Sequence, residues 1–403
     1  MINEKILTFK CYRKRVNLKK IVKYINLIII IWCISIIIPS KSFAEDNIMS
    51  STKEQFNIGD FITESQRYMG DAFEEIDLKN VLNQAVQGKI DNKMISKVLL
   101  KVMGKEIHTS LKTLISILVI IIIHGILKSI TDNLENKNIS QIVYFVQYIL
   151  IVTLMMTNFT EIIKLVQNTA TDMVGFINLL LPLLMTLILY TGSITTSSIL
   201  EPIIIFAINL IGNLIKDFLL PVMLIIVVFS IISKISNKFQ IDKLSKLLKS
   251  GVTWTLGIIL TVFVGIVSLE GSLSSSVDGI TAKTAKTAVS SVIPVVGKIL
   301  GDVVDSVLGC GVILKNAVGI VGVVVVISIC IVPIIRISTL CIIYSFSSAL
   351  VQPIADEKIV KVLEEMAGIF KVLLGILCSL SVMLIIGITL VIKISNSGMM
   401  YRW

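Results

Sequence analysis

Long apolar runs follow one another through the chain, and they constrain its fold more than any other feature. Eight runs of about 15 to 31 residues are separated by polar or charged residues: 113–130, 141–159, 173–190, 203–233, 252–269, 312–335, 337–351 and 368–392. A helix needs about 20 apolar residues to cross a bilayer. With 55% hydrophobic and 16% charged residues, the chain is also too apolar for a soluble protein. We therefore predict an all-α, polytopic helical membrane protein with about eight or nine membrane helices.

The amino terminus has the order of a secretory signal peptide. A basic segment precedes about 14 apolar residues at 25–38, a run that is short for a transmembrane helix. Pro39 then ends the run, and a small-x-small cleavage site ends at Ala44. We predict a signal peptide over residues 1–44, the alternative being an uncleaved anchor. In both cases the residues from Glu45 onward are exported.

Residues 45–110 are polar and carry apolar positions at helical spacing, which predicts a small exported helical region. Each of two apolar stripes has a candidate N-cap before it and a glycine after it that would end the helix. The first stripe lies between Asp77 and Gly88, and the second lies between Asp91 and Gly104. The region is too short to form a large hydrophobic core by itself. Its apolar stripes therefore need a surface to pack against. The three alternatives are the membrane surface, the chain's own membrane helices and another protein.

The run 203–233 is too long for one straight crossing. Its 31 residues would extend about 46 Å as a helix, against a hydrocarbon core of about 30 Å. We favour two short passes that turn at Lys216 and Asp217, because this puts the following lysines inside, as the positive-inside rule prefers. The alternative is one tilted span that continues as an interfacial helix. Residues 111–270 would form a first group of membrane helices.

The stretch 234–250 within that group is basic and amphipathic. Five lysines alternate with apolar residues at helical spacing. The stretch either lies on the membrane surface or is an ordinary basic loop.

Ionisable residues at membrane depth are costly and mark candidate functional sites. His124, Lys216 and Asp217 are the candidates that lie deep within apolar runs. A charged pair inside a split run resembles the broken helices of transporters, although a turn between two short helices needs the same residues.

The sequence carries no signature of an enzyme. It has no phosphate-binding glycine loop, zinc-protease motif or serine nucleophile elbow. Its two histidines are too isolated to suggest a metal site, and we expect no cofactor. The net charge of +10 does not indicate nucleic acid, because many basic residues lie in the leader or at the ends of apolar runs.

Residues 271–311 are expected to form a polar loop and then an amphipathic helix, before a second membrane group at 312–403. Lys298, Asp302 and Asp305 share one face of that helix. Glycines recur from Gly297 and Gly301 to Gly319 and permit close approach between helices. This approach is either a contact of a homo-oligomer or tight packing within one chain.

The same segment resembles the stage III sporulation protein AE family. The resemblance rests on an ordered series of short motifs: Asp278-Gly279, Thr284-Ala285-Lys286, Pro294-Val295-Val296-Gly297-Lys298 and Leu314-Lys315-Asn316-Ala317-Val318-Gly319. The layout of leader, short exported region and polytopic remainder is also similar. These motif residues are candidates for core or oligomer contacts.

The resemblance implies a membrane subunit of the channel complex that connects mother cell and forespore, needed for forespore maintenance and late forespore gene expression. It also implies that the protein lies in the mother-cell-derived membrane around the forespore, with its N-terminal region in the intermembrane space. The implied partners are proteins of the same sporulation operon, the forespore channel partner and the lipid bilayer. The residues alone leave an alternative, a permease-like transporter with a substrate or ion site at Lys216 and Asp217.

Overall fold

The computed structural model describes residues 49, 51–88, 92–131, 137–191, 194–235, 241–292 and 296–400. The chain divides into two units, Met1–Asn47 and Ile48–Trp403. The first unit contains the predicted signal peptide and lies outside the described residues. The described part consists of helices joined by short turns, without a strand, as predicted. Its helices are α3 (Ile58–Tyr68), η1 (Asp71–Phe73), α4 (Leu78–Val86), α5 (Asn92–Thr131), α6 (Lys137–Tyr190), α7 (Ile194–Asn213), the π-helix η2 (Leu214–Leu219), α8 (Leu220–Ile235), α9 (Asp242–Val292), α10 (Val296–Val351) and α11 (Glu357–Met400).

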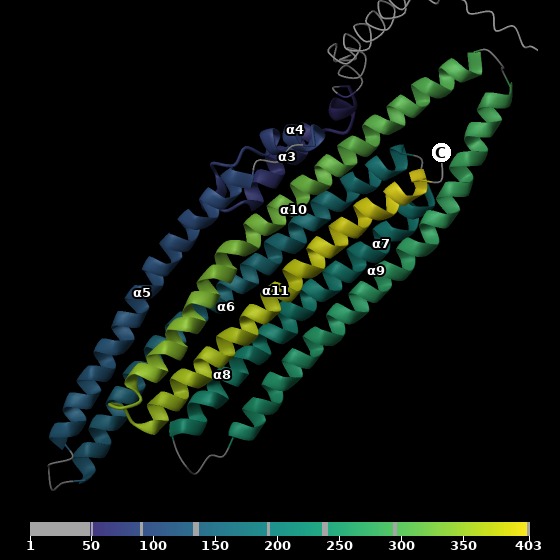
Figure 1. Ribbon diagram of the computed structural model, residues 1–403. Helices are drawn as coiled ribbons and strands as arrows, with labels where there is room; N and C mark the ends of the chain where they lie inside the picture. Colours follow the sequence, from purple (N-terminus) through teal and green to yellow (C-terminus); the bar gives the residue numbers. More distant parts are fainter. Residues whose placement is uncertain are drawn as a thin grey trace, which may run out of the picture. The chain divides into compact units, whose positions relative to one another are not determined.

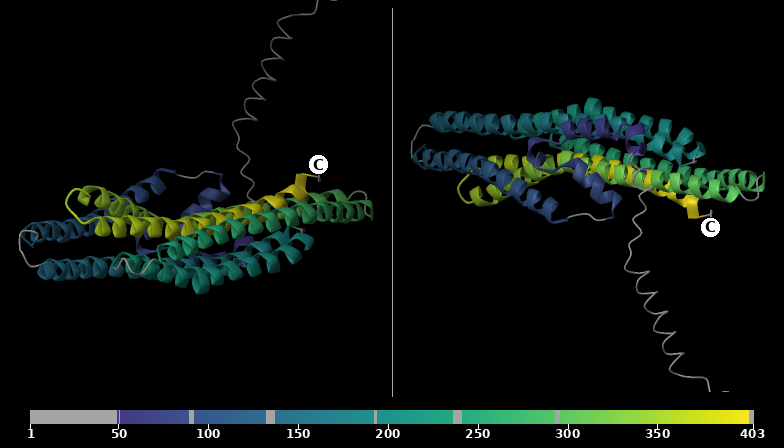
Figure 2. Two further views of the ribbon diagram at one scale, coloured as in Figure 1. Left: turned by 90° about the horizontal axis from the view of Figure 1, so that it is seen from below. Right: turned by 90° about the horizontal axis from the view of Figure 1, so that it is seen from above.

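The long helices lie alongside one another, with α10 packed against α11, α6 and α5 (Figure 1). The same near-parallel arrangement is visible from above and below (Figure 2). Specific contacts show whether neighbouring helices run parallel or antiparallel. Gly311 and Gly322 of α10 meet Tyr190 and Leu180 of α6, so these two helices are antiparallel. The hairpins of α10 with α11 and of α8 with α9 are antiparallel as well.

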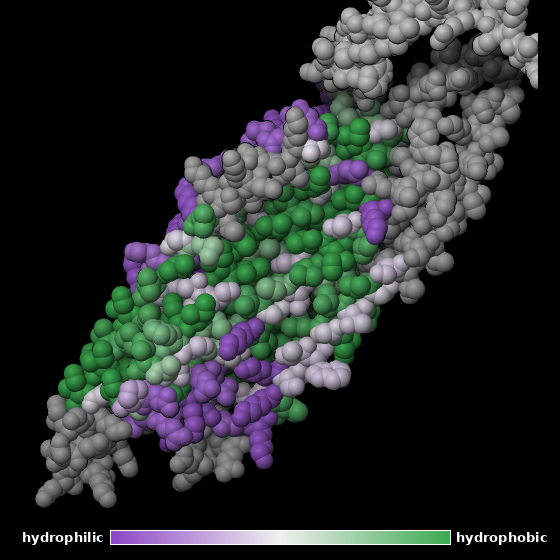
Figure 3. Space-filling model, in the orientation of Figure 1, coloured by the Kyte–Doolittle hydropathy of each residue, from purple (hydrophilic) through white to green (hydrophobic). Residues whose placement is uncertain are grey.

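Aromatic residues fill the centre of this bundle. Phe159 of α6 and Tyr344 of α10 both pack on Phe370 of α11, with ring centroids 6.4 and 5.2 Å away. The Asn158 amide donates a hydrogen bond to the Tyr344 hydroxyl at 2.9 Å, so that this buried polar group has a partner. Large apolar side chains remain exposed on the outside of the bundle, which Figure 3 shows as a broad hydrophobic surface. Such a surface suits lipid rather than water.

Six helices of the described part are long and apolar enough to span a membrane: Leu100–Ile123, Tyr148–Tyr190, Pro202–Lys234, Asp242–Ile266, Val307–Val351 and Glu357–Lys393. The expected eight or nine membrane helices are therefore not confirmed. The difference arises because the runs 141–159 and 173–190 share α6, and the runs 312–335 and 337–351 share α10. A continuous helix crosses a planar bilayer once. No glycine or proline separates the two runs in α6, so nothing in the sequence stops the helix between them.

The expected turn at Lys216 and Asp217 is wrong. The run 203–233 continues as one helical segment, and the two residues lie in the π-helix η2 between α7 and α8. Pro221 lies just after η2 and has no backbone N–H to donate to the carbonyl of Asp217, so the α-helical hydrogen-bond pattern is interrupted there.

The polar residues 271–292 also differ from the expected loop, because their backbone continues α9 to Val292. This stretch contains serine, threonine, alanine and lysine but no proline, and a helix tolerates these residues.

The N-terminal helical region packs on the chain's own long helices. Asp77 caps α4 by accepting a hydrogen bond from the backbone N–H of Lys79 at 2.9 Å, and Gly88 ends the helix with a φ of 69°. Both residues were predicted in these roles. Gly104 does not end a helix, because α5 continues through it, and Asp91 lies outside the described residues. The first of the two predicted apolar stripes lies in α4, which packs on α10, one of the chain's own long helices. The second stripe lies in the first part of α5. The helix α3, which was not among the predicted stripes, packs mainly on α6.

Candidate functional site

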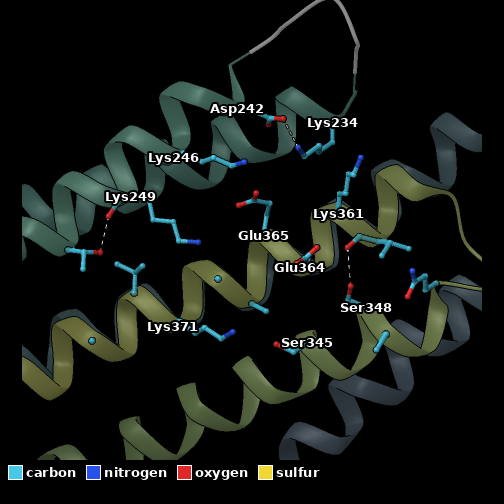
Figure 4. Close-up of a pocket in the computed structure, with 18 of the residues that line it drawn as sticks. Lys234, Asp242, Lys246, Lys249, Ser345, Ser348, Lys361, Glu364, Glu365 and Lys371 are labelled. Atoms are coloured by element: carbon cyan, nitrogen blue, oxygen red, sulfur yellow. Dashed lines mark hydrogen bonds and ion pairs between the residues drawn. The ribbon is translucent and has the colours of Figure 1, made fainter.

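A hydrophilic cavity of about 1130 Å³ lies where α8 ends, α9 begins, α10 ends and α11 begins. Hydrophilic side chains gather at this end of the molecule (Figure 3). The charged residues that line the cavity are Lys234, Asp242, Lys246, Lys249, Lys361, Glu364, Glu365 and Lys371, and Figure 4 shows them converging from α8, α9 and α11.

The α9 side of the cavity follows from helical spacing. Lys246, Lys249 and Thr253 are three and four residues apart, so they share one face of the helix. The amine of Lys249 reaches across to α11, where it contacts the position that a Cβ at Gly368 would occupy. The absence of a side chain at Gly368 therefore makes room for the lysine head group.

The α8–α9 connection is held by polar contacts on the bundle side. Lys234 and Asp242 form an ion pair of 2.7 Å across the connection, and the lysine side chain is 12% exposed. The hydroxyls of Ser230 and Ser245 lie 2.8 Å apart and are buried, which ties α8 to α9 one turn deeper. These contacts fix the position from which the α9 lysines enter the cavity.

The walls from α10 and α11 are joined by a hydrogen bond from the Ser348 hydroxyl to the Val360 carbonyl, 3.2 Å long. At the start of α11, Lys361 pairs with Glu357 at 2.5 Å, with both side chains more than half exposed. Lys361, Glu364, Glu365 and Lys371 then place charges of both signs along the cavity side of α11 (Figure 4). Five lysines against three carboxylates leave an excess of positive charge.

Chemically, the cavity is suited to binding an anion. Lysine ammonium groups are donors only, and the Ser345 hydroxyl that lines the cavity adds a donor that can also accept. The Thr253 hydroxyl donates to the Lys249 carbonyl at 3.0 Å. Within the described ranges, no group of three or more His, Cys, Asp or Glu side chains is placed to hold a metal ion.

The predicted pair Lys216 and Asp217 lies elsewhere. Neither lines the cavity, and neither makes an ion pair among the described residues. The Asp217 side chain is exposed on the outer surface of the bundle. His124 lies in α5, and its side chain is outside the described part.

The motif residues divide between described and undescribed parts of the chain. Asp278, Gly279 and Lys286 belong to α9, and Gly297, Lys298 and Gly301 belong to α10, but their side-chain surroundings are not described. Pro294 lies between the described ranges.

Lys315, Asn316 and Gly319 lie in the packed part of α10. Lys315 is fully buried and donates a hydrogen bond to the Ile392 carbonyl of α11 at 3.3 Å. One turn away, a Cβ at Gly319 would overlap the Ile392 side chain. Asn316 is half-buried. The glycines Gly311, Gly319 and Gly322 thus serve packing within one chain.

Sequence reasoning missed the cavity as a site. It recognised the basic stretch 234–250 but not the residues opposite, at the start of α11. Lys361, Glu364 and Lys371 recur at helical spacing, which was a signal available in the sequence. The sequence does not show that this face of α11 pairs with α9, which lies more than 100 residues earlier in the chain.

Comparison with known proteins identifies the family. The model of the stage III sporulation protein AE family matches residues 76–395. The chain is similar to the stage III sporulation protein AE of Bacillus subtilis (strain 168), with 28% identity over 277 residues, which cover 69% of each chain. No solved structure matches. Since the family model matches more than half of the chain, from just before α4 into α11, the chain belongs to the stage III sporulation protein AE family.

Proposed function

We propose that this sporulation membrane protein is a subunit of the channel complex that connects mother cell and forespore, needed for forespore maintenance and late forespore gene expression. The observation that carries the proposal is the family match over residues 76–395, which includes all six candidate spans. Its membrane would be the mother-cell-derived membrane around the forespore. Its partners would be proteins of the same operon and the forespore channel partner.

Helix connectivity supports an orientation with the N-terminal region in the intermembrane space. If each of the six candidate spans crosses once, residues 49–88 lie on one side, with the α6–α7 and α9–α10 connections. The basic stretch 234–250 then lies on the opposite side, as the positive-inside rule requires of the mother-cell side. A single crossing by α6 brings these lysines inside without a turn at Lys216.

Deletion of the gene in its own spore-forming host tests the proposal. Forespores that complete engulfment, then shrink and fail to start late transcription are expected, and the intact gene should restore both. Normal spores in the deletion strain would refute the proposal.

The double substitution Lys216→Gln/Asp217→Asn separates a structural subunit from a transporter. Because neither side chain lines the cavity or makes an ion pair in the described part, we expect a normal membrane level and normal sporulation. A protein that reaches the membrane at its normal level yet gives no spores would favour the permease-like alternative. Lys105→Gln/Glu106→Gln, an adjacent and mostly exposed pair on α5, is the matched control.

A further inference from the structure

We propose that the cavity between α8, α9, α10 and α11 binds the phosphate group of an anionic phospholipid. This inference concerns the ligand of the cavity, and it holds or fails independently of the channel assignment.

The charges of the cavity select an anion over a cation. Five lysines and three carboxylates line it. Lys234 pairs with Asp242, and Lys361 pairs with Glu357. Three lysines, Lys246, Lys249 and Lys371, remain against Glu364 and Glu365. Lys249 is half-buried at the inner wall and contacts Gly368, so at least one ammonium group lies inside the cavity rather than at its rim. A phosphodiester accepts hydrogen bonds only, and these donors match that requirement.

The depth of the cavity matches the level of lipid head groups. Its walls are the ends of four candidate membrane-spanning helices: α8 ends at Ile235 and α10 at Val351, while α9 begins at Asp242 and α11 at Glu357. Trp254 lies on α9 two turns beyond Lys246 and is 72% exposed. Exposed tryptophan is enriched at the membrane–water interface, where its ring meets both apolar and polar surroundings.

Exposed apolar residues adjoin lining residues of the cavity along α9 and α10, and this favours a lipid over a water-soluble anion. On α9, Leu247 follows Lys246 and is 67% exposed. On α10, Phe346 and Leu350 adjoin the lining residues Ser345 and Ala349, and both are exposed. A bound phospholipid would place its phosphate among the lysines and its acyl chains along these side chains. Basic pockets between membrane helices commonly bind anionic head groups in this way.

Titration of the purified full-length chain in detergent tests the proposal. The probes are phosphatidylglycerol, phosphatidylcholine and inorganic phosphate, and the readouts are native mass spectrometry of the bound lipid and the shift in Tm. We expect phosphatidylglycerol to bind and to raise Tm, phosphatidylcholine to bind more weakly, and inorganic phosphate to have no effect at the same concentration. Equal binding of the two lipids would overturn the proposal. A shift in Tm by inorganic phosphate without one by phosphatidylglycerol would also overturn it, because the site would then take a soluble anion.

Two charge variants locate the site. Lys246→Gln/Lys249→Gln/Lys371→Gln should weaken phosphatidylglycerol binding roughly 10- to 100-fold. The control Lys79→Gln/Lys105→Gln/Lys112→Gln removes the same charge from exposed positions on α4 and α5 and should leave binding unchanged. Equal weakening in both variants would show a general charge effect and overturn the proposal.

The opposite change keeps the test decisive if the lysine variant fails to fold. Glu364→Gln/Glu365→Gln removes both remaining carboxylates and should tighten phosphatidylglycerol binding several-fold. The control is Glu64→Gln/Glu74→Gln, two exposed acids of the N-terminal region. Unchanged binding in the Glu364 and Glu365 variant would overturn the proposal.

Discussion

At the scale of single residues, glycine positions on α10 decide how closely its neighbours approach. A side chain at Gly319 would overlap Ile392 of α11, whereas nothing lies within 4 Å of a Cβ at Gly309. We expect Gly319→Val to destabilise the bundle by about 1–3 kcal/mol through overpacking, and to lower Tm measured by circular dichroism in detergent. Gly309→Val on the same helix is the control, since it makes the same change in helix propensity without the overlap. Equal Tm values for the two variants would contradict the packing role of Gly319.

At the scale of elements, α4 shows how an amphipathic helix outside the long bundle is held. Leu78 and Leu82 are buried, and α4 packs on α10. We expect Leu82→Ala to lower the local unfolding free energy of α4 by about 2–5 kcal/mol, because a buried leucine leaves a cavity. Faster hydrogen exchange at the α4 amides would report this loss. Asn80→Ala removes an exposed side chain of the same helix and should leave exchange unchanged. If exchange is the same in both variants, α4 does not depend on that contact.

At the scale of the whole molecule, the number of crossings sets which connections share a side. Because α6 and α10 are each one helix, the connections after α5, α6, α8 and α9 should alternate between the two sides of the membrane. Fusions of a reporter active only outside the cytoplasm, ended in turn at residues 134, 193, 238 and 294, should alternate between inactive and active. Equal activity at residues 134 and 193 would instead mean that α6 spans the membrane twice or not at all.

The sequence by itself determined the class of this protein and much of its local structure. Apolar runs are too long and too numerous for a water-soluble core, so a polytopic helical membrane protein followed directly. Asp77 and Gly88 were identifiable as the limits of α4, because a cap and a positive φ depend on residues nearby in the chain. The family motifs were likewise visible in the linear order of residues.

Only the tertiary structure decided where helices continue and which faces meet. Charged residues such as Glu161 and Arg336 interrupt the hydropathy of α6 and α10 and indicate boundaries, yet they pair with each other at 3.1 Å between two unbroken helices. Gly104 was expected to end a helix, but α5 continues through it. The cavity combines residues of α9 with residues of α11 more than 100 positions away. Hydropathy and helical spacing are local properties of the chain, whereas the contacts that compensate a charge or enclose a cavity form only after distant helices pack together.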